Sequence, residues 1–291
     1  VDLMVNPYQE FDQFLKLAEN KNLTFVFSNT TEAGIALDQK DQFDATPPKS
    51  FPGKLLRLLH HRYKRFNGDT SKTLHIIPCE LIDKNGSKLK EVILELCKKW
   101  QLEDDFVSWI QQNHFYNTLV DRIVPGYPKE DLEFYKKDLP FDDQLIVTCE
   151  PFFLWIIEGN PKLLEVFPVD QLKNIDVKVV SDLGIYRTRK VRILNGSHTS
   201  LVPVGLLHGT PTVSETLKDD FLKSFLSHTL FDEIIPSVDF DKKELEDYAQ
   251  SVLERFSNPF IIHQLESISL NSISKFKVRV LPSLLSVSYT H

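Results

Sequence analysis

The first half of the chain alternates between segments with helical periodicity and short apolar runs rich in strand-forming residues. Apolar side chains recur at helical spacing in 7–22, and the run LTFVFSNT at 23–30 follows them. A second helical segment, 47–66, precedes the apolar run 72–82, and a third helical segment covers 88–100. Because strands that alternate with helices form parallel sheets covered by helices, the sequence predicts an α/β first domain.

The second half of the chain has a different pattern. Two further strand-like runs, 144–159 and 174–182, end the α/β part. After about Asp182 nearly every segment has helical period, and 214–236 and 241–259 each end at a proline. We therefore predict two domains: 1–183, an α/β domain, and 184–291, a mostly helical one.

Composition and charge exclude several classes of protein. With 42% hydrophobic and 26% charged residues, the chain fits a globular protein with a sizeable core. Its net charge of -7 and scattered basic residues argue against nucleic acid or an anionic membrane as the partner. Cys79, Cys97 and Cys149 are far apart, which predicts reduced thiols in a cytoplasmic protein. The most apolar run, 149–161, is interrupted by glutamates and is too short to span a bilayer.

Familiar site motifs are missing from the sequence. His60 and His61 are adjacent, so they cannot both bind a metal from one face of a helix, and no CxxC or HExxH spacing occurs. We therefore expect no metal. The G-x-S-x-G elbow of hydrolases and the G-x-G-x-x-G turn of dinucleotide-binding proteins are also not in the sequence.

One polar cluster stands out in RKVRILNGSHT, residues 189–199. At about 100° per helical residue, Asn195 and His198 lie at about 140° and about 80° from Lys190, within one arc. A buried lysine is easily neutralised and can act as a base, and an asparagine amide can donate to an alkoxide. A solvated polar face on a surface helix explains the spacing equally well.

Asn117, Asp121 and Arg122 form a second group, in the apolar stretch 113–128. They could belong to a site. Alternatively, Asp121 and Arg122 could be a buried structural ion pair.

A third group, in the loop SNTTEAGI, follows the predicted strand 23–30. Ligands bind at the carboxyl ends of parallel strands, so these side chains could bind a nucleotide ribose or phosphate. A polar loop with a helix N-cap is the other interpretation. The candidate cofactor-binding residues are Ser28, Asn29, Thr30, Thr31 and Glu32.

Three segments resemble motifs of the mannitol dehydrogenase family of polyol-specific long-chain dehydrogenases, and they occur along the chain in the same order as in that family. Residues 189–199 resemble its K-x4-N-x2-H signature, 117–125 its N-S-M-V-D-R-I element, and 149–159 its E-P-F-x-x-W segment. The similarity extends over almost the whole chain. Within the family, 258–282 and other segments are similar to the branch that interconverts D-altronate and D-tagaturonate.

The resemblance implies a Rossmann-like NAD-binding domain, incomplete at its N-terminus, followed by a helical substrate domain. It implies hydride transfer between NAD and C3 of a hexonate, without a metal. Lys190 would be the general acid/base, and Asn117 and Asn195 would stabilise the oxyanion. His198 would position the substrate hydroxyls and the lysine.

Substrate-binding residues are also implied, and one position departs from the family. Lys275 matches a substrate-binding lysine, whereas Ser267 stands where mannitol-type enzymes carry arginine. This departure disfavours a plain polyol and fits a substrate with a carboxylate. Lys54, Arg57 and His263 are candidates to bind that carboxylate, and we choose Lys54. We assign to substrate binding Lys275, Lys54, Asp121 and Arg122.

Members of the family begin with a Gly-rich unit that is not in this sequence, and Met4 is the only methionine. We therefore expect residues before Val1. Two alternatives stay open: a sibling enzyme acting on fructuronate or mannitol, and a non-catalytic remnant that serves as an interaction module. The oligomeric state does not follow from the sequence.

Overall fold

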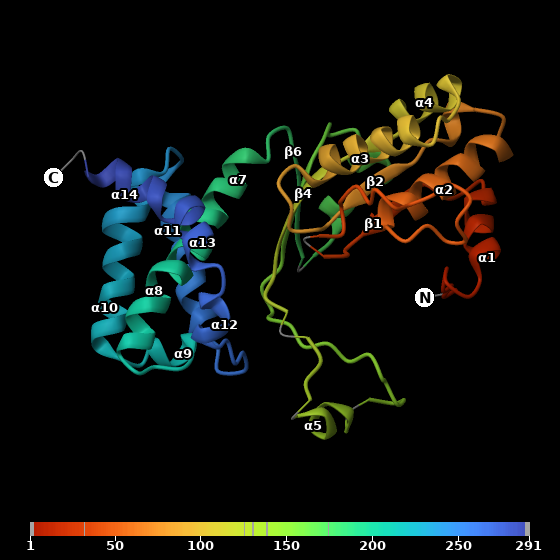
Figure 1. Cartoon of the computed structure of the whole chain (residues 1–291). Helices are drawn as coiled ribbons and strands as arrows, with labels where there is room; N and C mark the ends of the chain where they lie inside the picture. The colour runs from red at the N-terminus through yellow and green to blue at the C-terminus, as the bar shows by residue number, and fades with distance from the viewer. Residues whose placement is uncertain are drawn as a thin grey trace. The chain divides into compact units, whose positions relative to one another are not determined.

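The computed structural model describes residues 3–31, 33–124, 126–129, 131–137, 139–173 and 175–288. Residues 287 and 288 are described by their backbone alone. The chain forms two compact units (Figure 1). Unit 1 comprises Val1–Val120 and Trp155–Leu183, and unit 2 comprises Asp121–Leu154 and Gly184–His291. The chain thus passes between the units at three points, one of which is the predicted boundary after residue 183.

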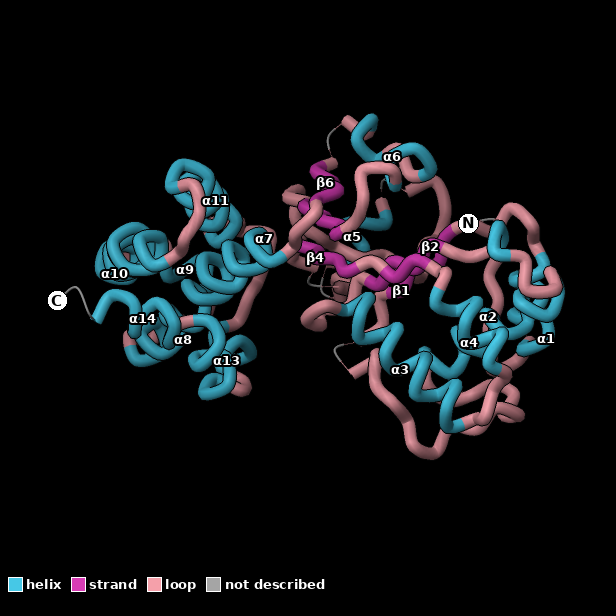
Figure 2. The backbone as a smooth tube through the Cα atoms, turned by 90° about the horizontal axis from the view of Figure 1, so that it is seen from above, coloured by secondary structure: helices cyan, strands magenta, loops and turns pink. Residues whose placement is uncertain are grey.

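A parallel sheet organises unit 1. Its strands β1 (Phe25–Ser28), β2 (His75–Pro78) and β3 (His114–Phe115) lie in that order, with Phe25 paired to His75 and His75 to His114. Figure 2 shows the main helices of this unit beside β1 and β2. They are α1 (Phe11–Lys16), α2 (Phe51–Arg65), α3 (Asn85–Lys99) and α4 (Asp104–Gln111). The predicted α/β fold with a parallel sheet is confirmed.

Short helical turns and a second sheet complete the α/β part. The strands of this sheet are β4 (Asn117–Asp121), β5 (Leu154–Glu158) and β6 (Asp176–Val180), in that order. The predicted strand 144–159 is wrong over 144–153, where Leu145 is 74% exposed. The remaining helices of unit 1 are η1 (Leu17–Glu19), η2 (Thr70–Lys72), α6 (Leu163–Val166) and η3 (Val169–Gln171), whereas α5 (Leu132–Lys136) belongs to unit 2.

Helices make up most of unit 2, as predicted, and α8 packs against α10, α12 and α13. Asp219 and Asp241 cap α10 and α11 by accepting hydrogen bonds from the backbone N–H groups of Leu222 and Glu244. In the described part of the chain, no helix is long and apolar enough to cross a membrane. The helices are α7 (Gly184–Arg189), η4 (Lys190–Asn195), α8 (Gly196–Leu207), α9 (Val213–Thr216), α10 (Asp220–His228), η5 (Thr229–Ile234), η6 (Ile235–Ser237), α11 (Lys242–Phe256), α12 (Leu265–Ser269), α13 (Ser272–Arg279) and α14 (Leu281–Ser288).

A buried arginine ties α2 to the loops around it. Arg62 is 1% exposed, and its guanidinium donates to the carbonyls of Ala18 at 2.8 Å, Asn20 at 3.0 Å, Leu23 at 3.0 Å and Lys72 at 2.6 Å. The Asn20 carbonyl also accepts from the N–H of Leu23 at 3.1 Å, and Arg62 supplies a donor to the carbonyls of Ala18, Leu23 and Lys72, which lie in short helical turns and a loop.

Arg62→Met therefore removes donors from four carbonyls at once. We expect the free energy of unfolding to fall by roughly 2–4 kcal/mol, because each unsatisfied buried acceptor is costly. Urea unfolding followed by tryptophan fluorescence measures this, since the three tryptophans, Trp100, Trp109 and Trp155, all belong to unit 1. The exposed Arg65 on the same helix is the matched control, and an equal effect of Arg65→Met would contradict the argument.

Candidate functional site

Lys190, Asn195 and His198 lie on one continuous helical stretch that changes its winding. Residues Lys190–Asn195 form a π-helix, and α8 continues from Gly196. In a π-helix each N–H bonds five residues back rather than four, so Asn195 lies over Lys190. The predicted α-helical angle of about 140° between them is therefore wrong. The π turn aligns the two side chains more closely than an α-helix would.

Lys190 is buried among charged groups. Its side chain is 12% exposed, and its Nζ lies 3.9 Å from Oδ1 of Asp121. Burial lowers the pKa of Lys190, against the opposing effect of the Asp121 carboxylate, and the positive charge of Arg255 lowers it further. This burial contradicts the interpretation of the cluster as a solvated surface face.

His198 has a free ring nitrogen inside the protein. The residue is 7% exposed, and its ring stacks on Phe256 at 4.1 Å and meets the His263 ring edge-on at 5.1 Å. Its Nε2 is buried and has no hydrogen-bond partner among the described residues. Burial, and then the neighbouring His263, lower its pKa well below the usual value, so the imidazole is neutral. Such a nitrogen can accept or donate one hydrogen bond to a bound hydroxyl.

Asp121 belongs to a buried network, which we call the Asp121 network, formed with Glu150, Tyr248 and Arg255. The guanidinium of Arg255 donates to Asp121 at 2.9 and 3.2 Å and to Glu150 at 2.8 and 2.9 Å. The hydroxyl of Tyr248 donates to Oδ2 of Asp121 at 2.5 Å. Sequence reasoning did not single out Arg255, Tyr248 or Glu150 as site residues, because they lie far along the chain from Asp121.

The predicted ion pair between Asp121 and Arg122 is wrong. Asp121 is the last residue of β4 and pairs with Arg255, whereas Arg122 lies just beyond the strand. Arg122 Nε donates instead to the carbonyl of Glu150 at 3.0 Å, and its guanidinium lies over the ring of Phe153. The substrate-binding roles assigned to Asp121 and Arg122 stay predictions.

Charges within the Asp121 network keep its members in defined protonation states. Burial raises the pKa of Asp121, but the hydrogen bonds of Arg255 and the charge of Lys190 outweigh it and lower the pKa overall. Burial and the adjacent Asp121 carboxylate raise the pKa of Tyr248 well above its usual value, so its hydroxyl stays a donor. Within the network, Asp121 is therefore an anionic carboxylate held by a phenol and a guanidinium.

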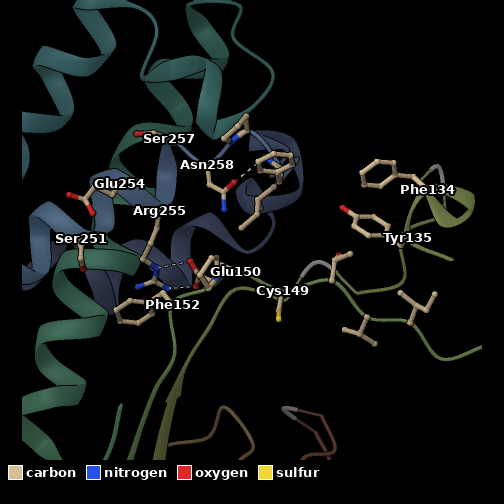
Figure 3. A pocket seen from close by; sticks show the side chains of 17 residues that line it. Phe134, Tyr135, Cys149, Glu150, Phe152, Ser251, Glu254, Arg255, Ser257 and Asn258 are labelled. Atoms are coloured by element: carbon tan, nitrogen blue, oxygen red, sulfur yellow. Dashed lines mark hydrogen bonds and ion pairs between the residues drawn. The ribbon is translucent and has the colours of Figure 1, made fainter. Parts of the chain in front are cut away.

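A cavity of about 950 Å³ opens beside this network in unit 2 (Figure 3). Glu150 and Arg255 form part of its wall, where Figure 3 shows them joined by dashed lines, and Phe152 lies under the guanidinium at 4.1 Å. Phe134 and Tyr135 line another part of the wall. The lining is mostly apolar, as is usual for small-molecule pockets.

Lys275 lies at a second, smaller cavity of about 360 Å³ in unit 2. Its Nζ donates to the carbonyl of Ile268 at 2.8 Å. Ser267, at the position where the resemblance expects arginine, is exposed. The substrate-binding role of Lys275 stays a prediction.

In unit 1, the predicted cofactor loop folds onto a glutamate. Ser28 Oγ donates to Oε2 of Glu80 at 3.0 Å, and Thr30 donates to Oε1 through its N–H at 3.1 Å and its hydroxyl at 2.8 Å. Asn29 and Thr31 are exposed, and Glu32 lies outside the described residues. Sequence reasoning missed Glu80, although parallel strands end at the same edge of a sheet and Glu80 follows β2 by two residues.

Asn117 uses its amide within unit 1. Its Oδ1 accepts from the N–H of Ser87 at 2.9 Å, and its Nδ2 donates to Glu158 at 2.7 Å. The start of α3 approaches closely here, since a Cβ on Gly86 would lie 2.2 Å from the carbonyl oxygen of Tyr116. The second amide hydrogen of Asn117 is not used in these contacts, and its role toward an oxyanion stays a prediction.

Lys54 and Arg57, the candidates for a substrate carboxylate in α2, contact nearby segments of unit 1. Lys54 Nζ donates to the Tyr8 hydroxyl at 3.0 Å and to the carbonyl of Lys49 at 2.7 Å. Arg57 donates to the carbonyl of Phe43 and stacks on its ring. Their roles toward substrate stay predictions. Among the described residues, no three His, Cys, Asp or Glu side chains gather as metal ligands.

Solved structures with the same fold are dehydrogenases. The crystal structure of D-sorbitol dehydrogenase in substrate-free form superposes with a TM-score of 0.80 at 23% identity over 97% of this chain and 59% of that one. The Pseudomonas fluorescens mannitol 2-dehydrogenase ternary complex with NAD and D-mannitol gives a TM-score of 0.72 at 24% identity over 100% of this chain and 60% of that one. These likenesses establish the fold.

Curated relatives are more similar in sequence. The altronate oxidoreductase of Yersinia enterocolitica is 46% identical over 287 residues, which are 98% of this chain and 59% of that protein. The altronate oxidoreductase of Phocaeicola vulgatus is 47% identical over 96% of this chain and 58% of its own length. The chain thus spans about three fifths of the length of these relatives.

Two family models cover most of the sequence. The Mannitol dehydrogenase Rossmann domain matches residues 3–166, and the Mannitol dehydrogenase C-terminal domain matches residues 182–290. The second match contains Lys190, Asn195 and His198. The chain belongs to the mannitol dehydrogenase family.

Proposed function

We propose that the protein is an NAD-dependent oxidoreductase that interconverts D-altronate and D-tagaturonate, with Lys190 as the acid/base. The observation that carries the proposal is the buried Lys190, 3.9 Å from Asp121 and on the same helical stretch as Asn195 and His198. The choice of substrate is supported by relatives named altronate oxidoreductase at 45–47% identity.

The side chains divide the chemistry between them. In the reductive direction Lys190, as an ammonium, donates a proton to the carbonyl oxygen that becomes the alcohol, and in the oxidative direction its neutral amine takes that proton back. The amide of Asn195 donates a hydrogen bond to the same oxygen as negative charge develops. The neutral imidazole of His198 holds a neighbouring hydroxyl of the substrate through its unpaired Nε2.

Unit 1 has features that fit part of a dinucleotide site. Its parallel sheet ends in a polar loop, and Glu80 holds Ser28 and Thr30 so that the loop has a fixed course. Asn29 and Thr31, both exposed, are the residues that would hold NAD. When bound, NAD accepts or supplies the hydride.

The substrate is proposed to be a small hexonate or hexuronate, and the enzyme cytoplasmic. The free cysteines Cys79, Cys97 and Cys149 support a reducing compartment. Burial raises the pKa of Cys97 to about 12 and that of Cys79 to about 11, so neither thiol is a nucleophile at neutral pH.

The rate of NADH oxidation by the full-length protein tests this function. We expect tagaturonate to give the highest kcat/KM, fructuronate a lower one and fructose the lowest, because only the first two carry a carboxylate. A higher kcat/KM for fructuronate or fructose than for tagaturonate would show that the proposed substrate is wrong. Absence of both NADH binding and turnover would favour the non-catalytic alternative.

A further inference from the structure

Tyr248 and Arg255 reach the neighbour of Lys190 from another helix. We propose that they are positioning residues, which hold the carboxylate of Asp121 beside Lys190 and so set how tightly Lys190 keeps its proton. This inference rests on the proposed function, in which Lys190 is the acid/base. It extends the proposed mechanism by two residues that contact Asp121 and not the substrate.

The geometry of α11 allows both residues to act on one carboxylate. Tyr248 and Arg255 are seven residues apart on α11, so they lie on the same face two turns apart. The Tyr248 hydroxyl and Arg255 Nη1 both donate to Oδ2 of Asp121, at 2.5 and 3.2 Å. Arg255 Nη2 donates to Oδ1 at 2.9 Å, and this oxygen lies 3.9 Å from Nζ of Lys190. The carboxylate is therefore shared among three donors.

This sharing limits the pull of Asp121 on the lysine. A free buried carboxylate at this distance would hold the ammonium proton strongly, since opposite charges attract more in a low-dielectric interior. The hydroxyl of Tyr248 and the guanidinium of Arg255 already stabilise the charge of Asp121. The guanidinium of Arg255 also donates hydrogen bonds to the carboxylate of Glu150. Arg255 and Arg279 repel the ammonium, whereas Asp121 and Glu150 attract it. The pKa of Lys190 is therefore lower than that of an exposed lysine, which makes release of its proton easier.

Two substitutions separate this role from a purely structural one, because they act in opposite directions. Asp121→Asn removes the attracting charge, so the pKa of Lys190 falls, by roughly 1–3 units. Tyr248→Phe removes a competing donor but no charge, so Asp121 pairs more fully with the lysine and the pKa of Lys190 rises.

The pH profile of kcat for NADH-dependent reduction reads these shifts. Reduction needs the ammonium form, so activity is present at low pH and is lost as the pH rises through the pKa of Lys190. We expect this loss at lower pH in Asp121→Asn and at higher pH in Tyr248→Phe than in the wild type. Tyr63→Phe, in unit 1, removes the same atom away from the network and leaves the profile unchanged. Shifts in the same direction, or none, would overturn the inference.

A direct measurement keeps this inference separate from the proposed function. Acetic anhydride labels only neutral amines, and mass spectrometry of Lys190 peptides across a pH series gives the proton affinity without any turnover. An inactive wild type would refute the function alone. Opposite shifts in labelling by the two variants would still support the inference, and their absence would overturn it. Circular dichroism shows that each variant is folded.

Discussion

Replacing Lys190 with alanine in the full-length protein is expected to lower turnover roughly 10²–10⁴-fold, because acid–base catalysis by one positioned side chain contributes a factor of that order. NADH binding, measured by calorimetry, stays near the wild-type value, because Lys190 lies in unit 2 whereas the loop proposed to hold the cofactor lies in unit 1. Steady-state kinetics with tagaturonate measures the loss.

Chemical rescue makes this test specific for proton transfer. A small primary amine added to Lys190→Ala occupies the space of the missing side chain and restores part of the turnover, in proportion to its concentration. Lys218→Ala is the matched control, since Lys218 is exposed in the same unit and its removal changes neither rate nor rescue. Wild-type turnover in Lys190→Ala would remove this residue from the acid/base role.

Arg255→Met is expected to have the largest effect on stability. It leaves Asp121 and Glu150, both 1% exposed, without the cation that pairs with each of them. Breaking a buried ion pair by removing one partner costs about 3–5 kcal/mol, because an uncompensated charge stays buried. Urea unfolding followed by circular dichroism reports this loss, since unit 2 is mostly helical.

A control on the same helix separates burial from charge. Lys243 on α11 pairs with Asp247 at 2.6 Å, but both side chains are exposed. Solvent screens such a pair, so Lys243→Met should hardly move the unfolding midpoint. If Arg255→Met and Lys243→Met unfold at similar urea concentrations, the Asp121 network does not stabilise unit 2.

The α/β pattern of unit 1 and the helices of unit 2 could be predicted because hydrophobic periodicity is a local property. The strand run 144–159 was predicted too long, since apolar residues alone do not reveal that Leu145 and its neighbours are exposed. The spacing of Lys190, Asn195 and His198 leaves a site and a solvated face equally open, and the family resemblance favours a site, but neither predicts the π-helical winding. The same side chains are compatible with the backbone hydrogen bonds of an α-helix and of a π-helix, and packing against the rest of the protein decides which of the two forms.

Contacts made over long sequence distances could not be predicted. Arg255 and Asp121 are 134 positions apart, and nothing in either local sequence indicates the other. The position of Glu80 could have been predicted more easily, because a residue just after β2 lies near the end of the neighbouring parallel strand β1. What sequence does reveal is which side chains could do chemistry. Their protonation states depend on neighbours that only the fold brings together.

The π-helical segment gives this stretch a tolerance in length. Bonding five residues back instead of four accommodates one extra residue in a single turn, so the segment acts as an insertion absorbed without a loop. Losing one residue between Lys190 and Asn195 would let this turn rewind as α-helix, in which seven residues advance by about 700°, close to two full turns. The amine of Lys190 and the imidazole of His198 would then still lie on one face of the helix. Their chemistry therefore depends on the identity of the two side chains more than on the number of residues between them.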